Sequence, residues 1–558
     1  MRTYDLALTI VLFCPLGGRL ALAQLAVTPP EAAESPPAAT AIPPSTERVP
    51  LAGYRHAGFF LRDEKDTFII HPVMTAQIDH YAYFGPGVSS TSLKPTFAFK
   101  RVSLGFAGEV LTRWSFRVEM EMGRTALDNV SGRAVQTTAA APGEAPTESS
   151  GQYASAQTSK TYAALAPAFL GFRAHPALQF IAGQSLTPFT LENMTPPRFR
   201  PFMEKPLAAH ALGPIVNNGL DLMVSAWGVL GEEALTYIVA WTNGAGPNRL
   251  NTDGRGDLVA RIYIRPLASQ REWGALKDLQ FGGSFAYGSR DPLFSHADYN
   301  PMMTQGNYTF WRPTYQSAAI GRTVHVIPAH RQIAVAAEAR IPFSIFDIQG
   351  ELVYVDNGTR EVIGGYQNQN PAYAPGTLGY GRMHGFASYV MGSVWLFGPR
   401  ALGTPGQAMK PFHLDLRAEN TNAESSLQVL VRWEKMNLRY DGYSRTSPTT
   451  ATGEPAFTGV GPYDGDIRVH AISVGANCFI TKHLRFTGQW TTYLFPSSAP
   501  PTPTFPGGPV CNAAGCANRA AAPAQSLPSA PGAPLDQLQA RDHGHALHEL
   551  MFRAQAAF

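Results

Sequence analysis

The 558-residue sequence is poor in long apolar runs and in charged residues. After the N-terminus, no segment reaches the ~18–20 consecutive apolar residues of a membrane helix. The longest candidate, FASYVMGSVWLF, is too short and is broken by serine and glycine. Charged residues make up only 15% of the chain, and a net charge of +3 is too small to indicate a nucleic-acid partner. The sequence therefore argues against a helical membrane protein and against a nucleic-acid-binding protein.

Cysteine is also scarce, with four residues in the whole chain. Cys14 lies in the N-terminal leader, and Cys478 lies in a strand pattern, where it is expected to be a small apolar filler. Cys511 and Cys516 lie close together in a loop rich in proline, glycine and alanine. In an oxidising compartment they could form a disulfide, whereas a metal site would need further ligands. We expect no metal and no cofactor.

The sequence also lacks a Gly-x-Ser-x-Gly elbow, a Walker loop and a His-Glu-x-x-His motif, so we do not expect an enzyme. The leader, residues 1–23, is predicted to be a secretory signal peptide. It has an early Arg2, an apolar stretch from Leu6 to Phe13, and Ala21-Leu22-Ala23 before Gln24. Residues 24–50 are rich in proline and alanine and are predicted to be a periplasmic linker. Residues 51–558 are left for one folded domain.

That domain is rich in residues typical of strands and turns: 52 glycines, 46 prolines and 11% aromatics in the whole chain. The clearest hairpin is TFAFKRVSLGFAGEVLTRWSFRVEMEMG, with a turn at residues 111–113. One face of its two strands is apolar: Val102, Leu104, Phe106, Trp114, Phe116, Val118, Met120 and Met122. The opposite face is polar: Arg101, Ser103, Ser115, Arg117, Glu119 and Glu121.

The same alternation occurs in DLVARIYIRP, SSLQVLVRWEKM and HLRFTGQWTTYLF. A soluble sandwich would bury the apolar face, whereas a membrane barrel turns it toward lipid and turns the polar face toward a lumen. The export signal, the many strands and the alternation of long loops with tight turns favour the barrel. We predict a closed antiparallel transmembrane barrel with long extracellular loops and short periplasmic turns. At roughly ten residues per strand plus connections, the domain suits about 16 strands.

The last strand, ALHELMFRAQAAF, has the same pattern and ends the sequence on Phe558. His548, Leu550, Phe552 and Phe558 share one face, opposite Glu549, Met551, Arg553 and Gln555. This resembles the last strand of outer-membrane barrels, whose terminal phenylalanine the barrel-assembly machinery recognises. An ordinary half-buried edge strand is the alternative. The resemblance implies that Phe558 is an assembly signal.

Several segments, in order, resemble the phosphate-selective porins of the O and P type. They are FIIHPVMTAQIDHYAYF with Asp79, FKRVSLGFAGEVLTRWSFRVEMEMG, FIAGQSLTPFTLEN, FMEKPL, WTNGAG and GRGDLVARIYIRP. The family's paired arginines are Lys100-Arg101 here, and its Glu-Arg-Ser is Glu204-Lys205-Pro206. The resemblance implies a bacterial outer-membrane porin for phosphate or related anions, surrounded by lipid and forming a homotrimer.

If the apolar faces meet lipid, a set of arginines faces the lumen: Arg101, Arg117, Arg261, Arg265, Arg432, Arg485 and Arg553. Guanidinium groups bind phosphate and carboxylate oxygens, and a column of them would favour anions. Alternatively, they pair with Glu119, Glu121, Glu434 and Glu549 and only brace the barrel. Arg553, beside Glu549 near the periplasmic rim, is expected to contribute much less to selectivity.

The segment ENMTPPRFRPFMEKP, stiffened by proline, is predicted to narrow the pore with Arg198, Arg200 and Lys205. A surface loop is the alternative. The leading functional hypothesis is passive diffusion of anions. A general porin with weak anion preference and a plugged structural or surface-binding barrel remain open.

Overall fold

The computed structural model describes residues 50–55, 58–84, 95–123, 164–216, 219–251, 253–291, 299–306, 309–311, 313–317, 322–363, 377–400, 402, 406, 425–442, 465–495, 511–512, 515–516 and 545–558. Residues 51–558 form one compact unit. The predicted signal peptide and all but the last residue of the predicted linker lie outside the described residues. The side chains of Cys511 and Cys516 also lie outside them, although β21 (Cys511–Asn512) and β22 (Gly515–Cys516) pair with the two cysteines opposite each other.

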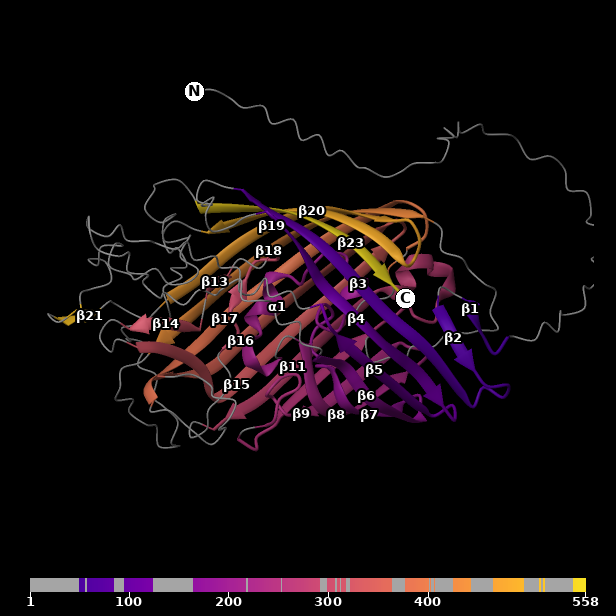
Figure 1. Ribbon diagram of the computed structural model, residues 1–558, viewed down its shortest axis with the longest axis horizontal. Helices are drawn as coiled ribbons and strands as arrows, with labels where there is room; N and C mark the ends of the chain where they lie inside the picture. The colour runs from indigo at the N-terminus through magenta and orange to yellow at the C-terminus, as the bar shows by residue number, and fades with distance from the viewer. Residues whose placement is uncertain are drawn as a thin grey trace, which may run out of the picture. The chain divides into compact units, whose positions relative to one another are not determined.

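Sixteen strands of the described residues form one closed antiparallel ring, so the predicted barrel and its strand number are confirmed (Figure 1). In ring order the strands are β3 (Phe68–Phe84), β4 (Thr96–Val110), β5 (Trp114–Glu121), β6 (Ala164–His175), β7 (Leu178–Leu186), β8 (Leu220–Leu230), β9 (Leu235–Thr242), β10 (Asp257–Ile264), β11 (Gln280–Arg290), β15 (Arg322–Phe343), β16 (Phe346–Ile363), β17 (Thr377–Phe397), β18 (Ser426–Gly442), β19 (Gly465–Phe479), β20 (Leu484–Phe495) and β23 (His545–Ala557). None of the helices in the described part of the chain is long and apolar enough to cross a membrane.

The ring closes where the last strand, β23, pairs with β3. Arg553 lies directly opposite Asp79, and the two side chains form a bidentate ion pair with both nitrogen–oxygen distances at 2.7 Å. Closure leaves no unpaired strand edge in hydrocarbon, where an unsatisfied backbone group would cost several kcal/mol. A short hairpin, β1 (Ala52–Arg55) and β2 (Gly58–Arg62), extends the sheet at the start of β3, and β14 (Thr314–Ser317) extends it along β15.

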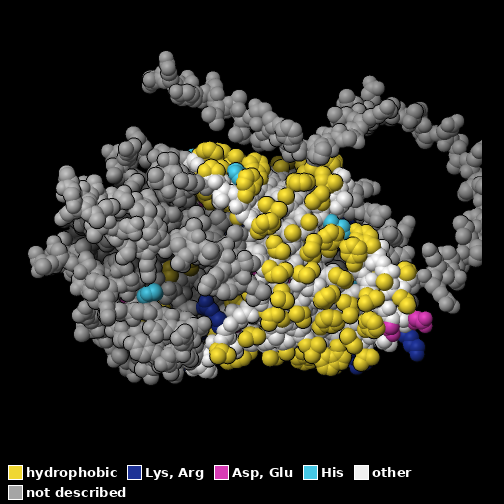
Figure 2. All heavy atoms as spheres, in the orientation of Figure 1, with side chains coloured by type: hydrophobic (Ala, Val, Ile, Leu, Met, Phe, Trp, Pro, Cys, Tyr) yellow, Lys and Arg dark blue, Asp and Glu magenta, His cyan; other side chains and the backbone are white. Residues whose placement is uncertain are grey.

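The two faces of the strands divide as the alternation predicts. Leu104, Phe106, Trp114 and Val118 are exposed on the outside, and Val102 and Phe116 are half-buried. In β23, Phe552 is exposed, whereas Glu549, Arg553 and Gln555 are buried inside. Figure 2 shows hydrophobic side chains covering the visible outer wall of the strands, with charged side chains at its edges.

Connections of very different length join the strands at the two ends of the ring. The end that carries Phe558, here called the turn rim, has tight turns at residues 111–113, 231–234, 344–345 and 480–483. Two connections at this rim are longer than predicted. Residues 265–279 contain a 3-10 segment, η5 (Arg271–Asp278), and residues 398–425 join β17 to β18. The opposite end is called the loop rim.

The connection between β7 and β8 leaves the loop rim and turns back into the barrel. Its residues 187–216, here called the inner loop, contain η2 (Pro197–Phe199), α1 (Leu207–Ala211) and η3 (Gly213–Ile215). The helix α1 packs against β16, β17 and β18. A second segment, containing β12 (Met302–Met303) and β13 (Thr309–Trp311), also packs inside, against α1.

Inside the lumen these segments form an apolar core with the wall. From the inner loop it contains Phe189, Phe202, Leu207, Leu212 and Ile215. From the second segment and the strands it contains Tyr299, Met302, Phe310, Trp311, Leu430, Met436 and Tyr493, among others. Each fully buried large side chain contributes about 1.5–3 kcal/mol, so the core fixes the inner loop in place.

The outward apolar band generates a first prediction. Replacing Leu104 with Arg should lower the free energy of unfolding by about 2–4 kcal/mol, because its side chain meets hydrocarbon near the middle of β4. Urea titration of the barrel refolded into lipid vesicles measures this. Leu104→Met is the matched control and should change little. An equally stable L104R variant would show that this face does not meet lipid.

The ion pair that closes the ring generates a second prediction. Arg553→Gln should lower the free energy of unfolding by roughly 3–5 kcal/mol, because Asp79 would be left as a buried charge without its main partner. The double variant Asp79→Asn/Arg553→Gln should recover much of this loss. The same urea titration, run as a double-mutant cycle, gives the coupling energy. A double variant as unstable as the sum of the single variants would contradict the pairing.

Candidate functional site

The inner loop is irregular because its sequence prevents regular structure. Pro188, Pro196, Pro197, Pro201 and Pro206 lack backbone donors and fix φ, so neither a long helix nor a ladder can form. Some of its backbone groups pair within the loop, as Met194 N–H does with the Thr190 carbonyl, and others need side chains of the wall, because few buried polar groups remain unpaired. The inner loop is therefore held in part by the inward-facing side chains of the strands.

Side chains of four neighbouring strands hold the inner loop by its backbone carbonyls. Each donates to one carbonyl: Gln555 to Arg198 (3.2 Å), Arg485 to Arg200 (2.7 Å), Asn477 to Pro201 (2.8 Å), Arg553 to Met203 (2.6 Å) and Arg432 to Glu204 (3.3 Å). These donors come from β18, β19, β20 and β23. The stretch 198–204 thus lies along one wall of the barrel.

The Glu204 carboxylate joins this stretch to β4 and β23. Both of its oxygens accept from Arg101, at 2.9 Å each, and Oε1 also accepts from Arg553 at 2.7 Å. Burial alone would raise the pKa of Glu204, but Arg101, Lys100 and Arg553 hold this pKa well below its ordinary value. Glu204 is therefore ionised at neutral pH. Arg553 also links Glu204 to Asp79, which it faces across the seam of the ring; its expected small contribution to selectivity stays a prediction.

Three further cations lie on the inner loop, as its sequence predicts. Arg198 donates to the main-chain oxygen of Phe558 at 3.0 Å, and Lys205 donates to Asn193 at 2.6 Å. Arg200 lies with Nε 3.9 Å from Glu192 Oε1, too far for a hydrogen bond. Burial, helped by the neighbouring Arg101, lowers the pKa of Arg200 to about 10, so it stays charged at neutral pH. Burial and Arg200 lower the pKa of Lys205 to about 7.

The remaining predicted arginines also face inward, but they pair with carboxylates in different parts of the barrel. Arg432 pairs with Glu434 at 2.8 Å, next to the inner loop. Arg117 pairs with Glu119 on its own strand. Arg261 pairs with Glu338 and donates to the Gly406 carbonyl, and Arg265 pairs with Glu233 and Asp278 at the turn rim. The structure therefore brings Arg101, Arg198, Arg200, Lys205, Arg432 and Arg485 together and leaves Arg261 and Arg265 outside the group. Arg117 lies at its border, where it and Glu119 act on the charge of Arg198.

Cations outnumber carboxylates around the inner loop. Among the described residues, seven cations belong to the loop or contact it: Arg101, Arg198, Arg200, Lys205, Arg432, Arg485 and Arg553. Five carboxylates accompany them: Asp79, Glu192, Glu204, Glu351 and Glu434. Cationic side chains exceed carboxylate side chains by two, and because the pKa of Lys205 is about 7, the excess positive charge at pH 7 lies between one and two. Within the described part of the chain, Arg200 Nε, Arg432 Nη2 and Arg485 Nε find no protein acceptor.

Sequence reasoning missed the second inner segment. The Gln305 backbone N–H donates to the Tyr493 hydroxyl at 2.8 Å, and its side chain donates to Glu434 at 3.0 Å. Glu549 accepts from Thr304 and from the Gly306 N–H instead of pairing with an arginine. The sequence around residue 305 has no charge or periodicity that would have indicated a position inside a barrel.

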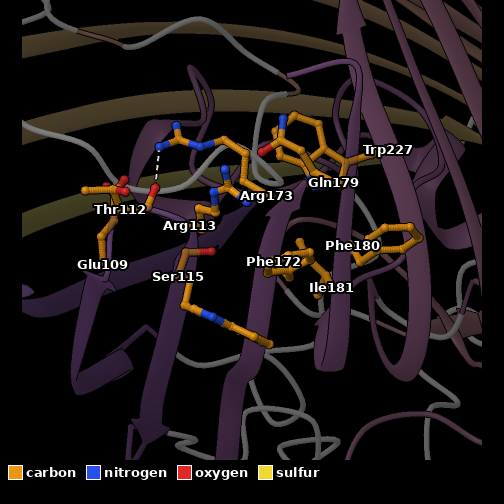
Figure 3. A pocket seen from close by; sticks show the side chains of 11 residues that line it. Glu109, Thr112, Arg113, Ser115, Phe172, Arg173, Gln179, Phe180, Ile181 and Trp227 are labelled. Atoms are coloured by element: carbon orange, nitrogen blue, oxygen red, sulfur yellow. Dashed lines mark hydrogen bonds between the residues drawn. The ribbon is translucent and has the colours of Figure 1, made fainter. Parts of the chain in front are cut away.

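A small depression lies at the turn rim, between the ends of β4 to β8 (Figure 3). Arg113 and Arg173 line it together with Glu109, Ser115 and Gln179, and Arg173 donates to the Thr112 carbonyl at 2.5 Å. It adds cationic side chains at the mouth of the barrel. Among the described residues, no group of three or more His, Cys, Asp or Glu side chains could hold a metal ion.

Phe558 is held by aromatic and backbone contacts. Its ring stacks on His483 at 4.5 Å and contacts Phe59 at 5.7 Å, and its N–H donates to the Met74 carbonyl at 2.8 Å. The inner loop reaches the same residue through Arg198. The role of Phe558 as an assembly signal stays a prediction, as do the predicted disulfide and the trimer.

Solved structures similar to this chain are outer-membrane proteins at low identity. A loop-deletion mutant of OmpT from Vibrio cholerae matches with a TM-score of 0.41 and 7% identity, over 88% of this chain and 100% of that one. The outer membrane channel DcaP of Acinetobacter baumannii has a TM-score of 0.39 and 10% identity (89% and 99% covered), and Salmonella typhi OmpF in complex with daunomycin has 0.39 and 9% (88% and 99%). At these TM-scores the evidence for the barrel is the strand pairing itself. No curated protein sequence matches the chain.

One stretch of the chain matches the sequence model of a known family. Residues 81–254 match the sequence model of the phosphate-selective porin O and P family. This stretch runs from β3 to just before β10 and contains the whole inner loop. Together with the closed barrel and its apolar outer face, it places the protein in the bacterial outer membrane. The resemblance predicted from the motifs is thus confirmed over residues 81–254, the part of the chain that matches this family model.

Proposed function

We propose that the protein is an outer-membrane channel that passes small anions, phosphate or related oxyanions among them. The observation that carries this proposal is the excess of cationic over carboxylate side chains around the inner loop, together with guanidinium donors that no described acceptor satisfies. Charges in a lumen walled by protein act strongly on a passing ion, because little water screens them. Several moderate sites also let an anion leave again.

A second candidate is a plugged barrel without transport. The observation that favours it is the apolar core formed inside the lumen by α1, the second inner segment and β15 to β20. Most of the predicted arginines also pair with carboxylates, as the bracing alternative requires. Single-channel recording of the purified protein in planar bilayers separates the candidates, since a plugged barrel would show no conductance steps.

The selectivity test is the reversal potential across a potassium chloride gradient. The intact protein should prefer chloride, and Arg200→Gln should lower the chloride-to-potassium permeability ratio. A unit charge at ~4 Å is worth about 1 kcal/mol even in water, so the fall should be roughly fivefold. Arg117→Gln removes the same charge from an inward pair with Glu119 and should do less. A cation-selective intact channel would overturn the proposed function.

The pH dependence of selectivity follows from Lys205. With a pKa of about 7 this side chain is charged at pH 6 and mostly neutral at pH 8, so anion preference should fall as the pH rises between these values. Reversal potentials at both pH values measure this. In Lys205→Met the change between pH 6 and pH 8 should be smaller. An undiminished change in this variant would assign the titration to another group.

A further inference from the structure

The Glu204 carboxylate is bound in the way that arginines bind a free oxyanion. Arg101 donates to both oxygens through Nη1 and Nη2 at 2.9 Å, and Arg553 Nη2 donates to Oε1 at 2.7 Å. Paired parallel N–H donors of this kind match carboxylate and phosphate equally well. The contact is thus a recognition geometry that a solute with the same oxygens could also satisfy.

The wall supplies most of this geometry, and the inner loop adds the Met203 carbonyl, which accepts from Arg553 at 2.6 Å. Arg101, on β4, also donates to Gln77 Oε1 on β3 at 2.9 Å. Arg553, on β23, is held in a bidentate pair by Asp79 on β3. Both guanidinium groups are therefore oriented mainly by strands next to one another in the ring, and Glu204 is the charged group that comes from the irregular inner loop.

The position is also within reach of the lumen. The side chains of Arg101 and Glu204 are 19% and 12% exposed, whereas those of the Arg553–Asp79 pair are fully buried. With Glu204 in place, two arginines face two carboxylates. With Glu204 turned away, Arg101, Arg553 and Asp79 leave one net positive charge and a vacant pair of Arg101 donors.

We propose that Arg101 and Arg553 form an oxyanion site, for phosphate or a carboxylate solute, which the Glu204 carboxylate of the inner loop occupies as an internal competitor. A solute enters by displacing Glu204, so the loop weakens binding enough for release. The inference rests on the proposed anion channel and names the site within it.

The test measures how strongly inorganic phosphate blocks chloride current at pH 7. Glu204→Gln removes the competing charge and keeps the volume. If Glu204 occupies the site about 90–99% of the time, this variant should lower the half-blocking phosphate concentration by roughly 10–100-fold. Glu119→Gln is the matched control, because it adds the same charge to the lumen beside Arg117. It should leave the half-blocking concentration within about twofold of the intact protein.

A double variant tests whether a loosened inner loop, rather than a freed site, causes the stronger phosphate block of E204Q. Arg101→Gln/Glu204→Gln should lose the gained phosphate affinity, whereas loosening alone would persist. An unchanged half-blocking concentration in E204Q overturns the inference, and so does a gain that survives in the double variant. The outcome is separable from the proposed function. A cation-selective channel in which E204Q still gained phosphate block would support the site and contradict the anion channel.

Discussion

The structure depends on one constraint: in hydrocarbon every backbone N–H and C=O must be paired within the protein. A sheet meets this constraint only by closing, so the last strand must find the first strand of the ring. The pairing of β23 with β3 does this, and the Arg553–Asp79 ion pair lies inside the seam. Closure then fixes which side chains face lipid and which face each other across the lumen.

The inward face meets a second demand, because charges removed from bulk water need partners. The inward-facing arginines find these partners in ion pairs and in hydrogen bonds to the carbonyls of the inner loop. The same guanidinium groups thus stabilise the barrel and set its electrostatic potential. Bracing and anion attraction are not exclusive, because cationic side chains outnumber carboxylate side chains around the inner loop. What distinguishes Arg200 from Arg117 is whether a carboxylate lies within hydrogen-bond distance.

Much of the barrel could be predicted from the sequence because strand alternation is local. The exposed Leu104 and Phe106, and the buried Arg261 and Arg432, follow from a period of two along each strand. The contacts of the inner loop could not be predicted. Glu204 meets Arg101 across 103 positions of sequence and Arg553 across 349. No local pattern encodes such pairs. The contacts of Arg553 with Asp79 and Glu204 were missed for this reason, and the segment around Gln305, which carries no charge, gave no signal at all.

The contacts of the inner loop also imply an order of events during folding. The loop is synthesised at residues 187–216, yet the side chains that grip its carbonyls lie between Arg432 and Gln555, at the end of the chain. Until the last strands exist, the carbonyls of the loop lack these donors, although Arg101 on β4 is already present to pair with Glu204. Docking is therefore a late step of biogenesis. The inner loop can dock fully only when the final strands are present. A chain truncated before these strands would lack the donors that hold the carbonyls of the loop.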